Sequence, residues 1–106
     1  MENENVQFKI PSDIVNWKWF RNAKVFSVFI WLLASANLED KTQFGELIER
    51  GSILTSNIQI AFDCGMTEAN VRAALACLEK TGDIKREKRN HYQIITVTNF
   101  EYYYNV

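Results

Sequence analysis

The fold is decided by residues 55–98, TSNIQIAFDCGMTEANVRAALACLEKTGDIKREKRNHYQIITVT. Ser56 and Gln59 have the spacing of a capping box, in which side chains satisfy the exposed N–H groups at the start of a helix. A first helix is therefore predicted over residues 55–63. The turn Cys64-Gly65-Met66 follows, and Gly65 permits the left-handed conformation that ends a helix.

A second helix is predicted over residues 67–81. Thr67 supplies a capping hydroxyl, and Glu68 places a negative charge in the positive first turn. Four apolar residues recur at intervals of three and four and predict one buried stripe: Val71, Ala74, Leu75 and Leu78. Lys80 favours the end of the helix, and Gly82 terminates it.

After the second helix the pattern becomes that of strands. Ile84–Lys88 and Tyr92–Thr98 are rich in β-branched and aromatic residues, and the turn 89–91 separates them. Two helices joined by a short turn have helix-turn-helix spacing, which presents the second helix to the DNA major groove. A basic hairpin directly after it would form a wing. The predicted fold class is therefore α+β, a mostly helical winged helix-turn-helix with a C-terminal β-hairpin.

The N-terminal half predicts the rest of one domain over residues 7–106, after a flexible tail of residues 1–6. A short strand over 7–10, a helix from Ser12 to about Phe20 and a helix over 23–36 are expected, with Ser12 and Asn22 as caps. The helix over 23–36 is apolar on nearly every side, which is typical of a core centre or a subunit interface.

Between that helix and the stretch that decides the fold, two short extended pieces are predicted around Arg50-Gly51, over residues 43–49 and 52–54. At the other end of the chain, residues 99–104 are expected to cover the core. No repeat, low-complexity tract or Pro/Gly linker interrupts the sequence, so a second domain is not expected.

The composition limits the classes of protein to which the chain can belong. The chain has 106 residues, 47% apolar, and a net charge of −1. The apolar run 25–36 is shorter than the roughly 20 residues of a membrane span, and the acidic N-terminus lacks a signal-peptide pattern. Cys64 and Cys77 fit reduced thiols better than a disulfide framework. A cytoplasmic protein is expected.

Catalytic and cofactor sites have no support in the sequence. Cys64, Cys77 and His91 are too widely spaced for a zinc motif, and they do not predict a Cys-His catalytic pair. The stretch 45–51 lacks the Lys-Ser/Thr of a phosphate-binding loop. A protein that is not an enzyme and takes no metal or cofactor is therefore expected.

The charge distribution favours DNA binding near the C-terminal end. Residues 71–106 carry six basic and four acidic side chains, against six and nine in residues 1–70. Groove-facing candidates on the second helix are Thr67, Asn70, Arg72 and Lys80. Candidates for phosphate contacts on the hairpin are Lys85, Arg86, Lys88, Arg89 and the turn residue His91. About four phosphate contacts would give a slope of log K against log salt near −3 to −4.

Alternatives remain open for several of these residues. The hairpin cations could be a solvated face, Arg72 could pair with Glu68 one turn earlier, and Asn70 could be a plain surface residue. Small residues on the outer side of the second helix predict weak sequence preference, or else a dimerisation surface: Ala69, Ala73, Ala76 and Cys77. Three tryptophans are expected to pack in the core rather than stack on single-stranded bases: Trp17, Trp19 and Trp31.

The chain also resembles a known family over residues 8–104. The resemblance rests on six stretches: NWKWF (16–20), FIWLLASAN (29–37), ERGSILTS (49–56), MTEANVRAAL (66–75), LEKTGDI (78–84) and YQIITVTNF (92–100). It is to the N-terminal winged-helix domains of phage and plasmid replication proteins of the replisome-organiser or DnaD-like primosome type. The resemblance implies binding of double-stranded DNA at a replication origin, a homo-oligomer, and a replicative helicase or helicase loader as partner. A transcriptional regulator would use the same DNA-binding face.

Overall fold

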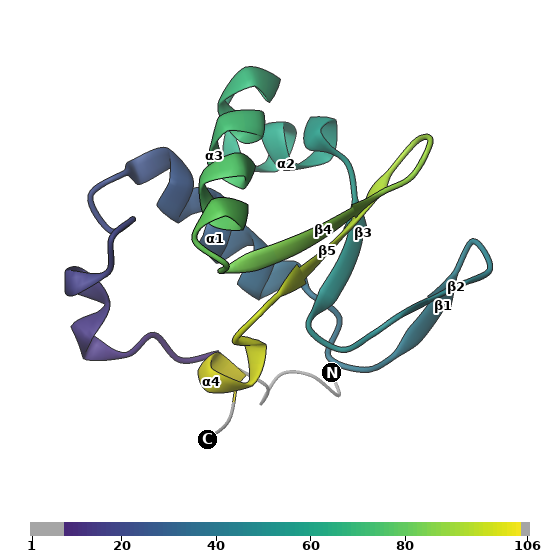
Figure 1. Cartoon of the computed structure of the whole chain (residues 1–106), viewed down its shortest axis with the longest axis horizontal. Coiled ribbons are helices and arrows are strands. Elements are labelled where there is room, and N and C mark those ends of the chain that lie inside the picture. The colour runs from purple at the N-terminus through teal and green to yellow at the C-terminus, as the bar shows by residue number, and fades with distance from the viewer. Residues whose placement is uncertain (1–7, 105–106) are drawn as a thin grey trace.

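Helix α1, Ala23–Ser35, forms the centre of the core in the computed structural model, which describes residues 8–104 (Figure 1). The predicted cap is confirmed, because Asn22 Oδ1 accepts a hydrogen bond from the Val25 N–H at 3.2 Å. The apolar residues on nearly every side of α1 have partners: α2 and α3 pack on it, and the rings of Trp17 and Tyr103 contact Phe29. The predicted tail, residues 1–6, lies outside the described residues.

The segment before α1 differs from its prediction. Residues 8–10 form no strand, and the predicted helix up to Phe20 is a single 3-10 turn, η1 (Ser12–Asn16). Ser12 lies inside η1 and does not cap it; Pro11 holds the capping position without a side-chain hydrogen bond. The helix ends early because Trp17 adopts an extended backbone and its ring packs 4.8 Å from that of Phe29.

The segment after α1 also differs from its prediction. The extended piece predicted over 43–49 is a hairpin of β1 (Lys41–Gln43) and β2 (Glu46–Ile48), which turns at Phe44-Gly45. Both turn residues have positive φ, 50° and 77°, as a two-residue hairpin turn of the primed type requires. Phe is rare in that conformation, and Gly45 alone is a weaker turn signal than the Asn-Gly or Asp-Gly pair that usually marks such a turn.

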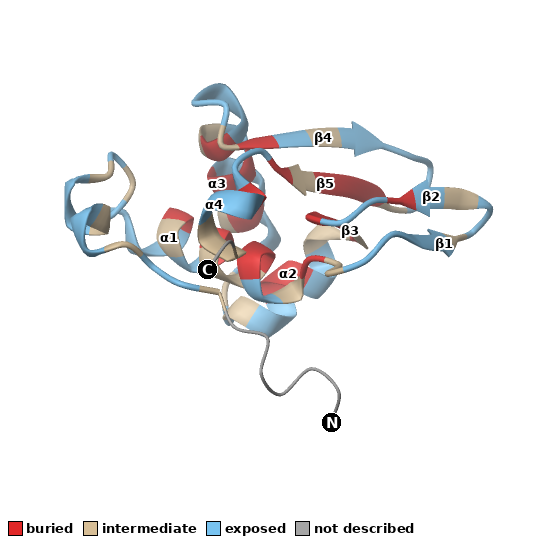
Figure 2. Ribbon diagram, turned by 90° about the horizontal axis from the view of Figure 1, so that it is seen from below, coloured by how far each residue is buried: buried red, intermediate tan, exposed pale blue. Residues whose placement is uncertain are grey.

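A three-stranded antiparallel sheet lies beside the helices, in the order β3-β5-β4. It consists of β3 (Ser52–Thr55), β4 (Ile84–Lys88) and β5 (Gln93–Val97), so the predicted C-terminal hairpin is confirmed. The central strand β5 is mostly buried, whereas β4 is an edge strand that is mostly exposed (Figure 2). The cations of β4 therefore lie at the free edge of the sheet.

The two helices predicted from residues 55–81 are confirmed as α2 (Asn57–Cys64) and α3 (Glu68–Lys80). Ser56 Oγ accepts from the Gln59 N–H at 3.2 Å, and Thr67 Oγ1 accepts from the Asn70 N–H at 3.1 Å. Gly65 ends α2 with a φ of 67°. None of the helices described is long and apolar enough to cross a membrane.

The chain closes over the core with α4 (Phe100–Tyr104), as expected for residues 99–104. Phe100 is buried, and the Tyr104 hydroxyl donates to the Leu33 carbonyl at 2.6 Å. Gly51 allows this closure. It has a φ of 84°, and a Cβ built on it would lie 3.0 Å from Phe100 Cβ and Cγ.

The close approach of Gly51 to Phe100 predicts unequal costs for two alanine substitutions. Gly65→Ala places a side chain at positive φ in open space and should cost about 1–2 kcal/mol of unfolding free energy. Gly51→Ala adds a steric conflict with Phe100 and should cost about 1–3 kcal/mol more. Urea unfolding of both variants measures the difference. Equal losses would show that Phe100 moves aside without cost.

Candidate nucleic-acid interface

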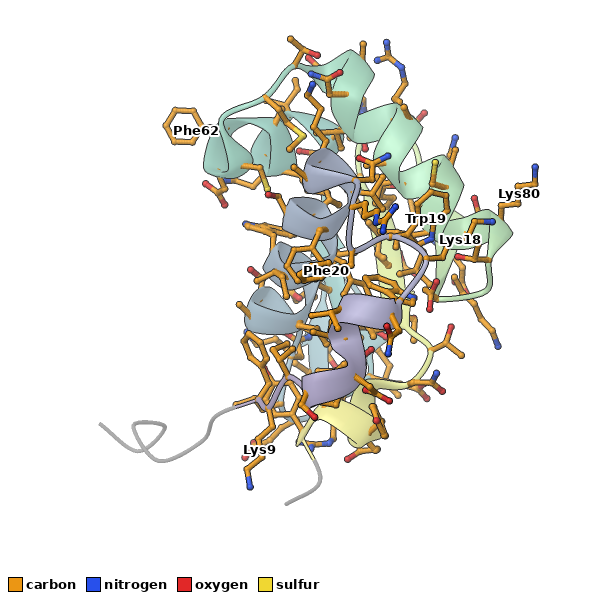
Figure 3. The ribbon with its side chains drawn as sticks, turned by 90° about the vertical axis from the view of Figure 1, so that its left-hand side faces the viewer. Lys9, Lys18, Trp19, Phe20, Phe62 and Lys80 are labelled. Atoms are coloured by element: carbon orange, nitrogen blue, oxygen red, sulfur yellow. The ribbon has the colours of Figure 1, made fainter. Side chains whose placement is uncertain are left out.

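Helix α3 is buried on one side only. The predicted stripe of Val71, Ala74, Leu75 and Leu78 is buried against the core, as the three- and four-residue spacing requires. The opposite side is exposed along the helix, at Ala69, Arg72, Ala73, Ala76 and Lys80. Lys80 projects away from the body of the molecule (Figure 3). An unobstructed helical face is therefore available to a partner.

The four predicted groove-facing residues occupy different positions on α3. Arg72 and Lys80 lie on the exposed side, and Thr67 is the exposed N-cap. Asn70 is half-buried. Among residues 8–104 Arg72 forms no ion pair, so the alternative pairing with Glu68 is not observed there. Arg72 and Lys80 are the two cations that α3 presents on its open face.

Arg86 joins the β4–β5 hairpin to α3. Its Nε and Nη2 atoms donate to Glu79 Oε1 at 3.1 and 2.8 Å, and only 12% of its side chain is exposed. Because the Glu79 carboxylate neutralises this guanidinium, Arg86 is a positioning residue rather than a free cation. The contact fixes the hairpin directly beside α3.

Arg89 is engaged in the same way at the hairpin tip. It binds Glu46 of β2, with Nη2 2.7 Å from Oε1, and it also contacts Glu87 at 3.1 Å. The Tyr92 hydroxyl donates to Glu46 Oε2 at 2.6 Å. The hydrogen bonds from Arg89 and Tyr92 lower the pKa of Glu46, and the acidic partners raise the pKa of Arg89. Arg89 therefore connects the two hairpins.

Lys85, Lys88 and His91 are the remaining predicted hairpin residues, and all three are exposed. In the part of the chain described, neither lysine has an acidic partner. Alternation along β4 puts Lys88 on the same face as Ile84 and Arg86, the face toward α3, and puts Lys85 on the other face. The four hairpin cations thus do not form one continuous charged ribbon.

A shallow hollow lies where the hairpin tip meets the starts of α2 and α3. Its volume is about 290 Å³, and its lining includes Asn57, Glu68, Lys88, His91 and Gln93. Gln93 Nε2 donates to Asn57 Oδ1 at 2.6 Å, which joins β5 to the first turn of α2. The structure therefore brings Lys88, Arg89 and His91 together at this hollow, beside the start of α3, whereas Lys80 lies at the other end of that helix.

The tryptophans and cysteines behave as structural residues. All three tryptophans are half-buried and pack against the core, as expected; Trp31 Nε1 donates to Asp63 Oδ2 at 2.9 Å. Cys64 and Cys77 are unpaired, and burial raises the pKa of the Cys64 thiol. Residues 8–104 contain no group of three His, Cys, Asp or Glu residues that could hold a metal ion.

A second group of cations was missed by the sequence reasoning. Lys18, Arg21 and Lys24 are all exposed and lie around the start of α1, near the C-terminal end of α3. The sequence does indicate this cluster, because no acidic residue occurs between Asp13 and Glu39. Over the long segment 1–70, distant acids hide this local excess of positive charge.

Comparisons with protein-family models, with curated proteins and with solved structures find no match to this chain.

The Glu46 contacts predict a dependence of stability on pH. The pKa of Glu46 is below the ordinary 4.5 in the folded chain, so its stabilising effect is fully present above pH 4.5. It is lost as the pH falls through the folded-state pKa. The free energy of unfolding of wild type should therefore exceed that of Glu46→Gln at neutral pH, and the difference should shrink in acid. Urea unfolding between about pH 3 and 7 tests this; a difference independent of pH would contradict it.

Proposed function

We propose that this chain is a winged-helix domain that binds duplex DNA through the exposed face of α3 and the β4–β5 hairpin. One observation carries the proposal: α3 follows α2 after a three-residue turn, keeps its outer face open, and is joined by the Glu79–Arg86 ion pair to a hairpin with free lysines. This combination supplies a helix that fits a groove and cations beside it.

The dimensions of α3 suit the major groove. Its 13 residues extend about 20 Å, and a helix of ordinary diameter fits the roughly 12 Å width of the groove. Arg72 and Lys80 would contact base edges or the walls of the groove. Thr67 and Asn70 would lie at the start of α3, beside the hollow. Exposed Ala69, Ala73 and Ala76 offer no hydrogen-bond donors, so sequence preference is weak in this proposal.

The hairpin contributes affinity through fewer free charges than its composition suggests. Lys85 and Lys88 would contact phosphates, with His91 as a further donor at the tip. Arg86 and Arg89 act through position, since their guanidinium groups already bind carboxylates. About two phosphate contacts by the hairpin should therefore contribute about −2 to the slope of log K against log salt concentration.

The biological setting follows from the family resemblance. We propose that the DNA is a phage or plasmid replication origin, that the chain acts as a homo-oligomer, and that a replicative helicase or helicase loader is its partner. The six resembling stretches support this setting. A transcriptional regulator would use the same face of α3, and the location of the bound DNA would separate the two.

A protein-interaction module is the second candidate, and a specific observation favours it. On α2, Ile58 is 65% exposed and Phe62 is 84% exposed, one helical turn apart. Apolar side chains exposed side by side often mark an interface. In this alternative the chain self-associates without retaining DNA.

The proposed function predicts that removing the two free hairpin lysines weakens DNA binding. We expect Lys85→Gln/Lys88→Gln to bind a labelled duplex of about 20 base pairs roughly tenfold more weakly at low salt. The slope of log K against log salt concentration should be shallower by about 2. Fluorescence anisotropy over about 50–200 mM salt measures both quantities. Neither lysine has an acidic partner among the described residues, so the fold should be retained.

The matched control is Lys9→Gln/Lys41→Gln, which removes the same charge from exposed positions on other elements. Lys9 lies far from Lys80 (Figure 3). If the two double variants bind equally, the role of the hairpin is wrong. If wild type fails to retain duplex at about 50 mM salt, the proposed function itself is rejected.

A further inference from the structure

We propose that Lys18, Arg21 and Lys24 form a second phosphate-binding site, on the side of α3 opposite the β4–β5 hairpin. This inference rests on the proposed function and adds to it. The ligand class is the phosphodiester backbone of duplex DNA. In this arrangement the backbone is held on both sides of α3, not by the hairpin alone.

The position of the cluster is fixed by a contact between distant parts of the chain. Trp19 Nε1 donates to Thr81 Oγ1 at 3.1 Å, and Thr81 is the C-cap of α3. Lys18 and Trp19 consequently lie beside the C-terminal end of α3, close to the point where Lys80 projects outward (Figure 3). The hairpin contacts α3 from the other side, through Glu79 and Arg86. Figure 1 shows this segment and the hairpin on opposite sides of α3.

The charge of the cluster is uncompensated by contacts within residues 8–104. None of its three cations forms an ion pair there, whereas Arg50, Arg86 and Arg89 all bind carboxylates. One acid is close: Asp83 accepts a hydrogen bond from Thr81 Oγ1 at 2.5 Å. In a chain with a net charge of −1, three neighbouring unpaired cations are a local excess that an anion can neutralise.

The surface at the cluster is hollowed rather than flat. A depression of about 410 Å³ is lined by Lys18, Trp19, Arg21, Asn22, Ala23 and Lys24. Lys18 Nζ lies 5.1 Å from the centroid of the Trp19 ring, so the indole that is anchored on α3 also orients this ammonium group. The depression has room for a phosphate group with its remaining water molecules.

Duplex geometry explains why two cation groups are useful. A helix seated in the major groove has one phosphate backbone on each side of it, because the two strands form the walls of the groove. Phosphate contacts on both walls fix the register and orientation of the protein. Lys88 on the face of β4 toward α3 and Lys85 on its other face, both on this edge strand, would serve one wall, and the cluster around Trp19 would serve the other.

The test is the variant Lys18→Gln/Lys24→Gln, compared with Lys85→Gln/Lys88→Gln and with the control Lys9→Gln/Lys41→Gln. Each removes two positive charges. In anisotropy titrations with the same duplex we expect Lys18→Gln/Lys24→Gln to bind about tenfold more weakly and to have a slope shallower by about 2. The quadruple variant should lose about 100-fold, since the two sites are separate and their effects should add.

Three results would overturn the inference. If the hairpin variant loses affinity while Lys18→Gln/Lys24→Gln matches the control, this site is wrong and the proposed function stands. If wild type binds no duplex, both fall together. If the substitution at 18 and 24 abolishes binding to vesicles of anionic phospholipid and leaves duplex affinity unchanged, the cluster serves a membrane surface. Thermal melting of each variant confirms that the fold is retained.

Discussion

The packing of α3 on α1 is the contact on which the rest of the structure depends. Val71, Leu75 and Leu78 are fully buried there, and each such side chain contributes about 1.5–3 kcal/mol relative to exposure. Burial of this stripe fixes the rotation of α3 about its axis. It thereby determines that Arg72, Ala73 and Lys80 face outward, and every inference about a partner starts from that orientation.

Electrostatic pairing then decides which cations remain available. Glu79–Arg86 and Glu46–Arg89 are only partly buried, and ion pairs open to solvent contribute a median of about 0–1 kcal/mol, so these pairs matter mainly for geometry. They hold the β4–β5 hairpin against α3 and against the β1–β2 hairpin. Within residues 8–104, Lys85 and Lys88 have no acidic partner. A basic composition therefore overstates the charge that the hairpin can offer to a polyanion.

The parts of the fold that follow from local rules were predictable from the sequence. The caps Asn22, Ser56 and Thr67 and the buried stripe of α3 depend on neighbours three or four residues away. The β1–β2 hairpin was not predictable, because Phe44 adopts a positive φ where Asn, Asp or Gly is usual, and Gly45 alone is a weak signal. Ser12 was mistaken for a cap because Ser is a common N-cap residue, but here it lies inside a 3-10 turn whose capping position is Pro11.

The candidate site was predictable as a set of residues but not as a set of free charges. Arg89 meets Glu46 across 43 residues, and Trp19 meets Thr81 across 62, so neither contact has a local signature. These two contacts changed the interpretation most. One removes a cation from the predicted phosphate contacts, and the other brings Lys18 to the end of α3.

The central claim is that a duplex lies across the outer face of α3. Its most direct test is a titration of the ¹⁵N-labelled chain with a duplex of about 20 base pairs, in which the changes in amide chemical shifts are measured. If the duplex lies there, the largest changes occur at Arg72, Ala73 and Ala76, with smaller changes over residues 18–24 and 85–91. Changes confined to Ile58–Phe62 of α2, with α3 unaffected, would contradict it.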